Sequence, residues 1–128
     1  MRAMNVRDLM KSPVHFCSPT HTLNEAARIF WEHDCGVLPV LSEKRQVVGM
    51  LTDRDVCIAA YTQGCTLRDL PVQLAMARAV TRCSPGHEIE AALQIMATAQ
   101  VHRLPVVDSG ERLVGLLSLT DIQRAAQS

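Results

Sequence analysis

The stretch "GVLPVLSEKRQVVGMLTDRDV", residues 36–56, predicts a β-hairpin followed directly by a helix. Two apolar runs, residues 37–41 and 46–51, flank the polar turn Ser-Glu-Lys-Arg, which is typical of two paired strands. The stretch "HRLPVVDSGERLVGLLSLTDI", residues 102–122, repeats the pattern with the turn Asp-Ser-Gly-Glu. The chain therefore contains the same hairpin-helix element twice.

The repeat extends well beyond the hairpin. A shift of 66 residues aligns residues 6–56 with residues 72–122 without a gap, and 16 of the 51 aligned positions are identical. A unit of this length that occurs twice indicates a pseudo-symmetric pair instead of a solenoid array. We predict one copy within residues 1–66 and the other within residues 67–128, each preceded by its own short lead-in helix (residues 6–10 and 70–76).

Each copy has the predicted order β-α-β-β-α. An extended segment (residues 14–17 and 80–83) ends at Ser-Pro, which disfavours a helix at that point. The next helix has an apolar face that in the first copy includes Phe30 and Trp31. The predicted fold class is α/β (α+β). Since a unit of ~55 residues buries little apolar surface alone, we expect the copies to pack sheet to sheet, with two related clefts between them.

Composition restricts the function classes. The 128 residues are 48% hydrophobic and 20% charged, only 3% are aromatic, and the formal net charge is zero. No electrostatic field favours nucleic acid or an anionic membrane, and no apolar run reaches the ~20 residues of a membrane span. We expect a cytoplasmic protein. Its five cysteines are an odd number without a CxxC pair, and most of them are expected to be reduced core residues.

The start of the last helix in each copy carries the candidate chemistry. Thr52 with Asp55, and Ser118 with Asp121, have the spacing of a helix capping box. The same spacing places a hydroxyl and a carboxylate beside the N–H groups of a helix start, which favour anions. The pattern alone is compatible with a plain helix start or with a site for a ribose and a phosphate.

The ordered fragments, repeated in register, resemble the CBS domain (named after cystathionine β-synthase). "LPV", a polar turn, "VVG" or "LVG" and Thr/Ser-x-x-Asp occur in both copies, so nearly the whole chain is similar to a stand-alone CBS pair, or Bateman module. The resemblance implies binding of an adenosine nucleotide (AMP, ADP or ATP) or of S-adenosylmethionine in the clefts between the repeats. It implies no required cofactor.

The resemblance also implies roles for individual residues. Asp55 and Asp121 would bind the ribose hydroxyls, while Thr52, Ser118 and nearby basic groups would bind phosphate. The base would lie against the first strand and the "LPV" strand of each copy. Those positions are His15, Leu38 and Pro39 in the first copy, and Thr81, Leu104 and Pro105 in the second. Pro39 and Pro105 have no N–H, so a neighbouring strand edge is expected to stay open to the base.

The copies differ in their cations. Arg54 lies inside the first motif, where the second has Leu119 and Thr120, and we expect tighter phosphate-dependent binding at the first. Arg103 precedes "LPV" in the second copy only. Lys11, just before the first strand, is a candidate phosphate contact or a solvated lysine. His21 and His87 share a repeat position and are expected to stabilise the helix entry.

We therefore expect a regulatory, ligand-sensing homodimer that signals to an unidentified protein in trans. No nucleophile elbow, P-loop or paired carboxylates suggest an enzyme. One alternative is a structural dimerisation protein with unoccupied clefts. Another is a metal- or redox-responsive module that uses the cysteines and histidines.

Overall fold

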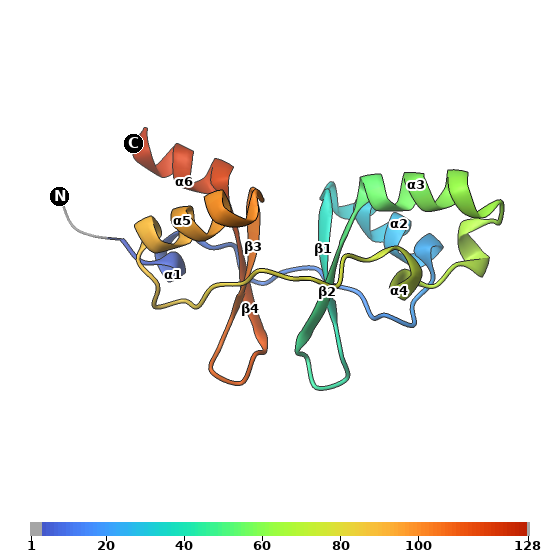
Figure 1. The fold of residues 1–128 in the computed structure, drawn as a ribbon, viewed down its shortest axis with the longest axis horizontal. Coiled ribbons are helices and arrows are strands. Elements are labelled where there is room, and N and C mark those ends of the chain that lie inside the picture. Colours follow the sequence, from blue (N-terminus) through green and yellow to red (C-terminus); the bar gives the residue numbers. More distant parts are fainter. Residues whose placement is uncertain (1–3, 128) are drawn as a thin grey trace. The chain divides into compact units, whose positions relative to one another are not determined.

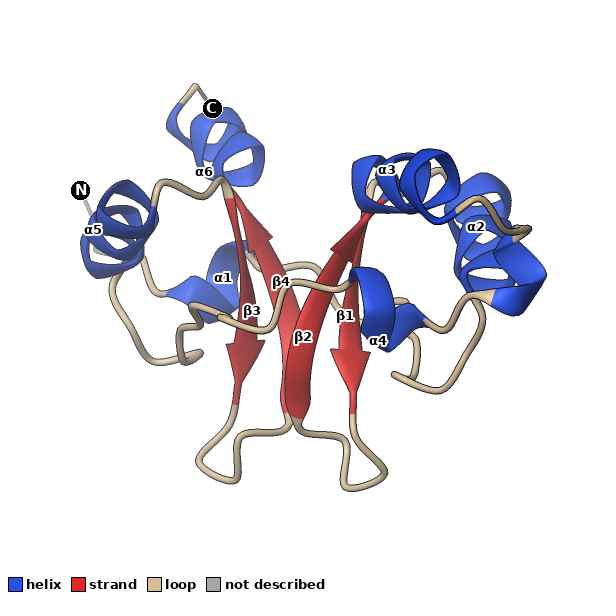
Figure 2. Cartoon of the chain, turned by 45° about the vertical axis from the view of Figure 1, so that its right-hand side comes forward, coloured by secondary structure: helices blue, strands red, loops and turns tan. Residues whose placement is uncertain are grey.

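The computed structural model of the chain describes residues 4–127. These residues form two compact units. The central unit comprises residues 15–80, and the terminal unit comprises residues 4–14 together with residues 81–127. Within each unit a two-stranded antiparallel sheet is accompanied by three α-helices (Figures 1 and 2). The mixed α+β character predicted from the sequence is confirmed.

The helices and the hairpin strands follow one another along the chain in the predicted order. In the central unit they are α2 (Leu23–His33), β1 (Val37–Leu41), β2 (Val47–Thr52), α3 (Asp53–Gln63), a 3-10 turn (Leu67–Asp69) and α4 (Val72–Ala75). In the terminal unit they are α1 (Val6–Leu9), α5 (Ile89–Ala99), β3 (Arg103–Val107), β4 (Leu113–Ser118) and α6 (Leu119–Ala126).

The two hairpins have the same register. Val37 pairs with Thr52 and Arg103 with Ser118, so the first residue of each hairpin lies opposite the residue that starts the following helix. The register shifts once in each hairpin, between the last two residues of the first strand. Because of this pairing, α3 begins at the end of the β1–β2 sheet and α6 begins at the end of the β3–β4 sheet. Figure 2 shows each helix directly after the second strand of its hairpin.

The segments predicted as first strands, residues 14–17 and 80–83, are extended, but each of them pairs with its neighbour at a single residue. Each contributes one parallel bridge beside the first hairpin strand, Cys17 with Val40 and Cys83 with Val106. Both cysteines are buried, as predicted for core residues.

The lead-in helices pack differently from our expectation. Helix α1 contacts β4 and α6, and Val6 belongs to the apolar core of the terminal unit. Helix α4 contacts β2 and α3, and Val72 belongs to the core of the central unit. Each lead-in helix therefore packs on the other copy from the one it was expected to begin. Val6 and Val72 are completely buried there, so each lead-in helix adds apolar burial to the unit on which it packs.

Two glycines allow the exchanged segments to cross the sheets closely. A Cβ at Gly49 would lie 3.0 Å from the carbonyl oxygen of Ala77, and one at Gly115 would lie 3.2 Å from that of Lys11. At these crossings Met50 pairs with Ala77, and Leu116 pairs with Lys11. Side chains at positions 49 and 115 would push the segments away from the strands.

The cores are almost entirely aliphatic. Leu38, Leu51, Leu104 and Leu117 are fully buried. Trp31 lies on the apolar face that the sequence predicts for α2, and it is 87% exposed. The buried stripe contains Leu23, Ala26 and Phe30, and a residue one position further is turned about 100° around the helix.

Candidate functional site

The start of α3 carries the predicted capping box in full. Thr52 Oγ1 accepts a hydrogen bond from the N–H of Asp55 at 3.1 Å, and Asp55 Oδ2 accepts one from the N–H of Thr52 at 2.9 Å. Among residues 4–127, no partner lies within hydrogen-bonding distance of Asp55 Oδ1. One carboxylate oxygen therefore stabilises the helix, while the other remains available to a ligand.

The backbone at the start of α3 differs from the sequence expectation of free N–H groups. The N–H of Asp53 donates to the carbonyl of Gly36 at 3.2 Å, and the N–H of Arg54 donates to Asp53 Oδ1 at 2.8 Å. With Asp55 N–H bound by Thr52, the first three N–H groups of the helix are all satisfied. A phosphate in the central unit would have to be bound by side chains, such as the exposed Arg54.

Beside β1, Pro39 ends the parallel pairing. The N–H of Cys17 donates to the Pro39 carbonyl at 3.1 Å, and the N–H of Leu41 donates to the Cys17 carbonyl at 2.9 Å. Continued pairing would require an N–H from residue 39 to the carbonyl of His15, and proline has none. That carbonyl has no hydrogen-bond partner in the described part of the chain. The imidazole of His15 stacks on that of His33, with ring centroids 3.8 Å apart.

The terminal unit repeats this arrangement. The N–H of Cys83 donates to the carbonyl of Pro105 at 3.1 Å, and the N–H of Val107 donates to the Cys83 carbonyl at 2.9 Å. Because Pro105 has no N–H, the carbonyl of Thr81 has no hydrogen-bond partner among residues 4–127, as is the case for the carbonyl of His15 in the central unit. Pro39 and Pro105, with the leucines that precede them, are fully buried. Both units therefore leave one backbone carbonyl without a partner among the described residues, whereas the leucines and prolines expected to contact the base are buried.

At the start of α6 only half of the capping box forms. Ser118 Oγ accepts a hydrogen bond from the N–H of Asp121 at 3.1 Å, but the reciprocal bond seen in the central unit is not made. The Asp121 side chain is only 11% exposed, and its Oδ1 lies 3.7 Å from Nζ of Lys11. Its Oδ2 is buried and has no hydrogen-bond partner among residues 4–127. A buried carboxylate oxygen without a donor is costly and marks a position that a ligand donor could fill.

The predicted residues divide between the units. The central unit brings together His15, Leu38, Pro39, Thr52, Arg54 and Asp55, whereas the terminal unit brings together Lys11, Thr81, Arg103, Leu104, Pro105, Ser118 and Asp121. Lys11 precedes the first strand in sequence, yet it belongs to the terminal unit, because its backbone pairs with Leu116 of β4. Arg103 is exposed and lies directly opposite Ser118 in the hairpin register.

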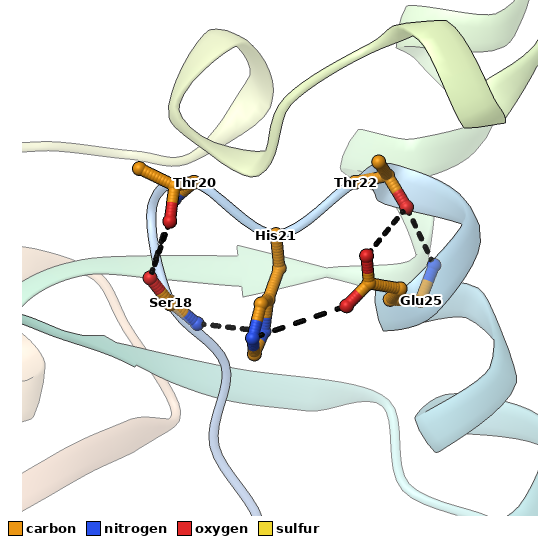
Figure 3. A network of polar contacts seen from close by, with 5 residues as sticks. All are labelled: Ser18, Thr20, His21, Thr22 and Glu25. Atoms are coloured by element: carbon orange, nitrogen blue, oxygen red, sulfur yellow. Dashed lines mark hydrogen bonds and ion pairs between the residues drawn. The ribbon is translucent and has the colours of Figure 1, made fainter.

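The two repeated histidines have the predicted helix-entry role. The N–H of Ser18 donates to His21 Nδ1 at 3.1 Å, and the N–H of Ser84 donates to His87 Nδ1 at 3.0 Å. Figure 3 shows that His21 Nε2 faces Glu25, which lies 3.9 Å away and also contacts the N-cap residue Thr22. These contacts order the turn before α2.

The cysteines have the properties of core residues at two positions. Burial raises the pKa of the Cys17 thiol to about 12 and that of Cys83 to about 11, so both thiols stay protonated and unreactive at neutral pH. Cys57 and Cys65 are exposed. Within residues 4–127 no group of three or more histidine, cysteine or acidic side chains is arranged to hold a metal ion.

Comparisons with known proteins agree with the repeat. The model of the CBS domain matches residues 6–61 and residues 67–128. The CBS domain-containing protein YhcV of Bacillus subtilis (strain 168) is 38% identical over 120 residues, which cover 92% of this chain and 82% of that protein.

Solved structures give the same result. The Hypoxic Response Protein I with two coordinated zinc ions is 31% identical with a TM-score of 0.84, covering 94% of this chain and 98% of that one. The CBS domain pair of protein MJ0100, in complex with 5′-methylthioadenosine and S-adenosyl-L-methionine, is 25% identical with a TM-score of 0.84, covering 96% and 99% of the two chains. Within residues 4–127, no helix is both long and apolar enough to cross a membrane.

Proposed function

The chain belongs to the CBS domain family as a tandem pair, and from this premise we propose that it binds adenosine nucleotides and reports their presence to a partner protein. CBS pairs are regulatory ligand-binding modules. The proposed ligands are AMP, ADP or ATP, with one site in each unit. Asp55 and Asp121 bind the ribose hydroxyls in this proposal.

One observation carries the proposal: Asp121 Oδ2 is buried without a hydrogen-bond donor. The neighbouring apolar strand offers no favourable contact to an ion or a water molecule. A nucleoside can use both features, because it presents ribose hydroxyls to the carboxylate and a flat base to the strand. A ribose hydroxyl is a donor of the kind that the orphaned oxygen lacks. Asp55 offers its unused Oδ1 in the same repeat position. The complex of the MJ0100 pair with two adenosine derivatives supports an adenosine ligand.

The unpaired carbonyls of His15 and Thr81 would favour adenine over other purine bases. The carbonyl of His15 in the central unit, and that of Thr81 in the terminal unit, are acceptors next to buried apolar strands. The exocyclic amino group of adenine is a donor, whereas guanine and hypoxanthine present an oxygen at the same ring position. An acceptor facing that oxygen leaves two polar groups unpaired. We propose that these carbonyls select adenine.

We further propose that the protein acts as a homodimer and signals in trans. The exposed aromatic residues Trp31 and Tyr61 lie on α2 and α3, and their side chains are 87% and 89% exposed. Apolar side chains of this size are depleted from the surfaces of monomers and enriched in interfaces. A second copy of the chain is the occupant that closed symmetry favours.

A thermal-shift screen followed by calorimetric titration tests the proposal. The ligands are AMP, ADP, ATP, adenosine, S-adenosylmethionine and 5′-methylthioadenosine, with GMP and IMP as controls. We expect adenosine compounds to raise Tm and to titrate to saturation, and GMP and IMP to do neither. Saturable binding of GMP equal to that of AMP would contradict the adenine assignment. No response to any adenosine compound would favour the structural dimerisation alternative.

A further inference from the structure

We propose that Lys11 makes the terminal-unit site selective for phosphorylated adenosine compounds, while the central-unit site accepts nucleosides and nucleotides alike. This inference rests on the proposed function and assigns a different specificity to each of its two sites. It reverses the order expected from Arg54, because Lys11 and Asp121 come together only in the folded chain.

The backbone of Lys11 is fixed on the sheet. Its N–H donates to the carbonyl of Leu116 at 2.9 Å, and the N–H of Leu116 donates to the Lys11 carbonyl at 3.0 Å. Gly115, the residue before Leu116, makes room for this crossing. Lys11 is therefore held opposite Leu116, which lies two residues before Ser118. From there its Nζ lies 3.7 Å from Asp121 Oδ1.

The central unit has no such cation at the equivalent place. Ala77 pairs with Met50 as Lys11 pairs with Leu116, and it aligns with Lys11 in the repeat. Ala77 contributes only a methyl group. The exposed side chain of Asp53 adds a negative charge at the start of α3, where the terminal unit has Leu119.

The backbone makes the same distinction between the two sites. In the central unit the N–H groups of the first three residues of α3 are all hydrogen-bonded. In the terminal unit the N–H of Leu119 donates to the His102 carbonyl at 2.8 Å and that of Asp121 to Ser118. The N–H of Thr120, between them, has no acceptor in the stretch that the structure describes. A cation and an unused N–H thus lie together at the start of α6 only, and both favour an anion.

An exchange of partners explains how Lys11 discriminates. Without ligand, Lys11 faces Asp121, and its side chain is 68% exposed and free to move. A nucleoside can donate a ribose hydroxyl to Asp121 Oδ2 while Lys11 stays beside Oδ1, so Lys11 adds nothing to the binding of a nucleoside. A nucleotide supplies a phosphate to which Lys11 can turn. Lys11 therefore favours AMP over adenosine at the same site.

Calorimetry with AMP and adenosine tests the inference on single-site variants. Asp55→Ala leaves the terminal-unit site to be measured, and Asp121→Ala leaves the central-unit site. We expect the terminal-unit site to prefer AMP over adenosine by about tenfold or more, the range for one charge-assisted contact. Lys11→Met in the Asp55→Ala background should remove most of that preference, by weakening AMP binding and leaving adenosine binding nearly unchanged. Lys44→Met, at an exposed lysine in the turn after β1, is the matched control.

The reciprocal graft gives an independent test. Ala77 is exposed, so Ala77→Lys is compatible with the fold. In the Asp121→Ala background it should confer an AMP preference of about tenfold on the central-unit site. This gain cannot result from a damaged fold.

Each outcome separates the inference from the proposed function. If the wild type binds neither AMP nor adenosine, the proposed function itself fails. If the wild type binds AMP but Asp55→Ala does not, the terminal-unit site is not an AMP site and the inference is overturned. An AMP preference that survives Lys11→Met, or one that resides in the central unit and disappears with Arg54→Ala, also overturns it.

Discussion

Thr52 and Asp55 exchange two hydrogen bonds at the start of α3, and only one oxygen of Asp55 takes part. The equivalent residues Ser118 and Asp121 make only one of these bonds, and Asp121 Oδ2 is buried without a donor. The same motif is therefore a complete helix cap in one unit and an incomplete one in the other. This difference separates the structural role of the carboxylate from its proposed role in binding.

The two aspartates should differ in their effect on stability. Asp55→Ala removes the secondary half of a cap whose main partner, Thr52, remains, so the free energy of unfolding should fall by well under ~1 kcal/mol. Asp121→Ala removes a buried, unpaired oxygen and a long, partly exposed ion pair, and it should leave stability unchanged or raise it by up to about 1 kcal/mol. Urea denaturation of both variants measures this. A clear loss of stability in Asp121→Ala alone would show that its carboxylate is satisfied in the folded protein.

Glycine at the end of α5 should stabilise the protein. Gln100 caps this helix in the left-handed region, with φ 56°, where residues with a Cβ are strained. Gln100→Gly should raise the free energy of unfolding by up to about 1 kcal/mol. The matched control is Gln94→Gly, in the exposed interior of the same helix, which should lower it by about 1 kcal/mol. Equal losses at both positions would contradict the left-handed cap.

Thiol reactivity should divide the cysteines by burial. Burial raises the pKa of Cys17 from 9.0 to about 12. Alkylation at about pH 9 should therefore modify the exposed Cys57 and Cys65 and leave the buried Cys17 unmodified. Mass spectrometry of the native protein after iodoacetamide treatment provides the measurement. Modification of Cys17 at the rate of Cys57 would mean that its unit opens readily.

The elements that follow from local patterns were predictable. The hairpins follow from the alternation of apolar runs and polar turns around Pro39 and Pro105, and the helix starts follow from the Thr/Ser-x-x-Asp spacing. The repeat adds independent support, since both copies predict the same elements. For this reason the fold class, the hairpins and the helix starts could be predicted from the sequence.

The contacts between distant segments could not be predicted. Lys11 joins Asp121 because a backbone crossing at Gly115 places it on β4. In the sequence, the shared repeat position of Gly49 and Gly115 is the one feature that indicates this backbone crossing. Hydrophobicity alone also does not distinguish the buried stripe of α2 from the neighbouring face, so the sequence does not say which of Phe30 and Trp31 is the exposed one.

The exposed aromatic residues should control the proposed dimer. Sedimentation of the wild type at tens of micromolar is expected to show a dimer, whereas Trp31→Glu and Tyr61→Lys should shift it to monomer without loss of folding. Lys44→Glu, in the turn that joins β1 and β2, serves as the control and should remain dimeric. A wild type that sediments only as a monomer would contradict the proposal.

The most direct test of ribose binding compares AMP with 2′-deoxy-AMP by calorimetry on the wild type and on Asp55→Ala and Asp121→Ala. If each carboxylate accepts the ribose hydroxyls, the wild type should bind AMP about tenfold to a hundredfold more tightly, because the deoxy compound leaves an acceptor unpaired. The preference should disappear at whichever site has lost its aspartate. Equal binding of AMP and 2′-deoxy-AMP to the wild type would show that Asp55 and Asp121 only start their helices.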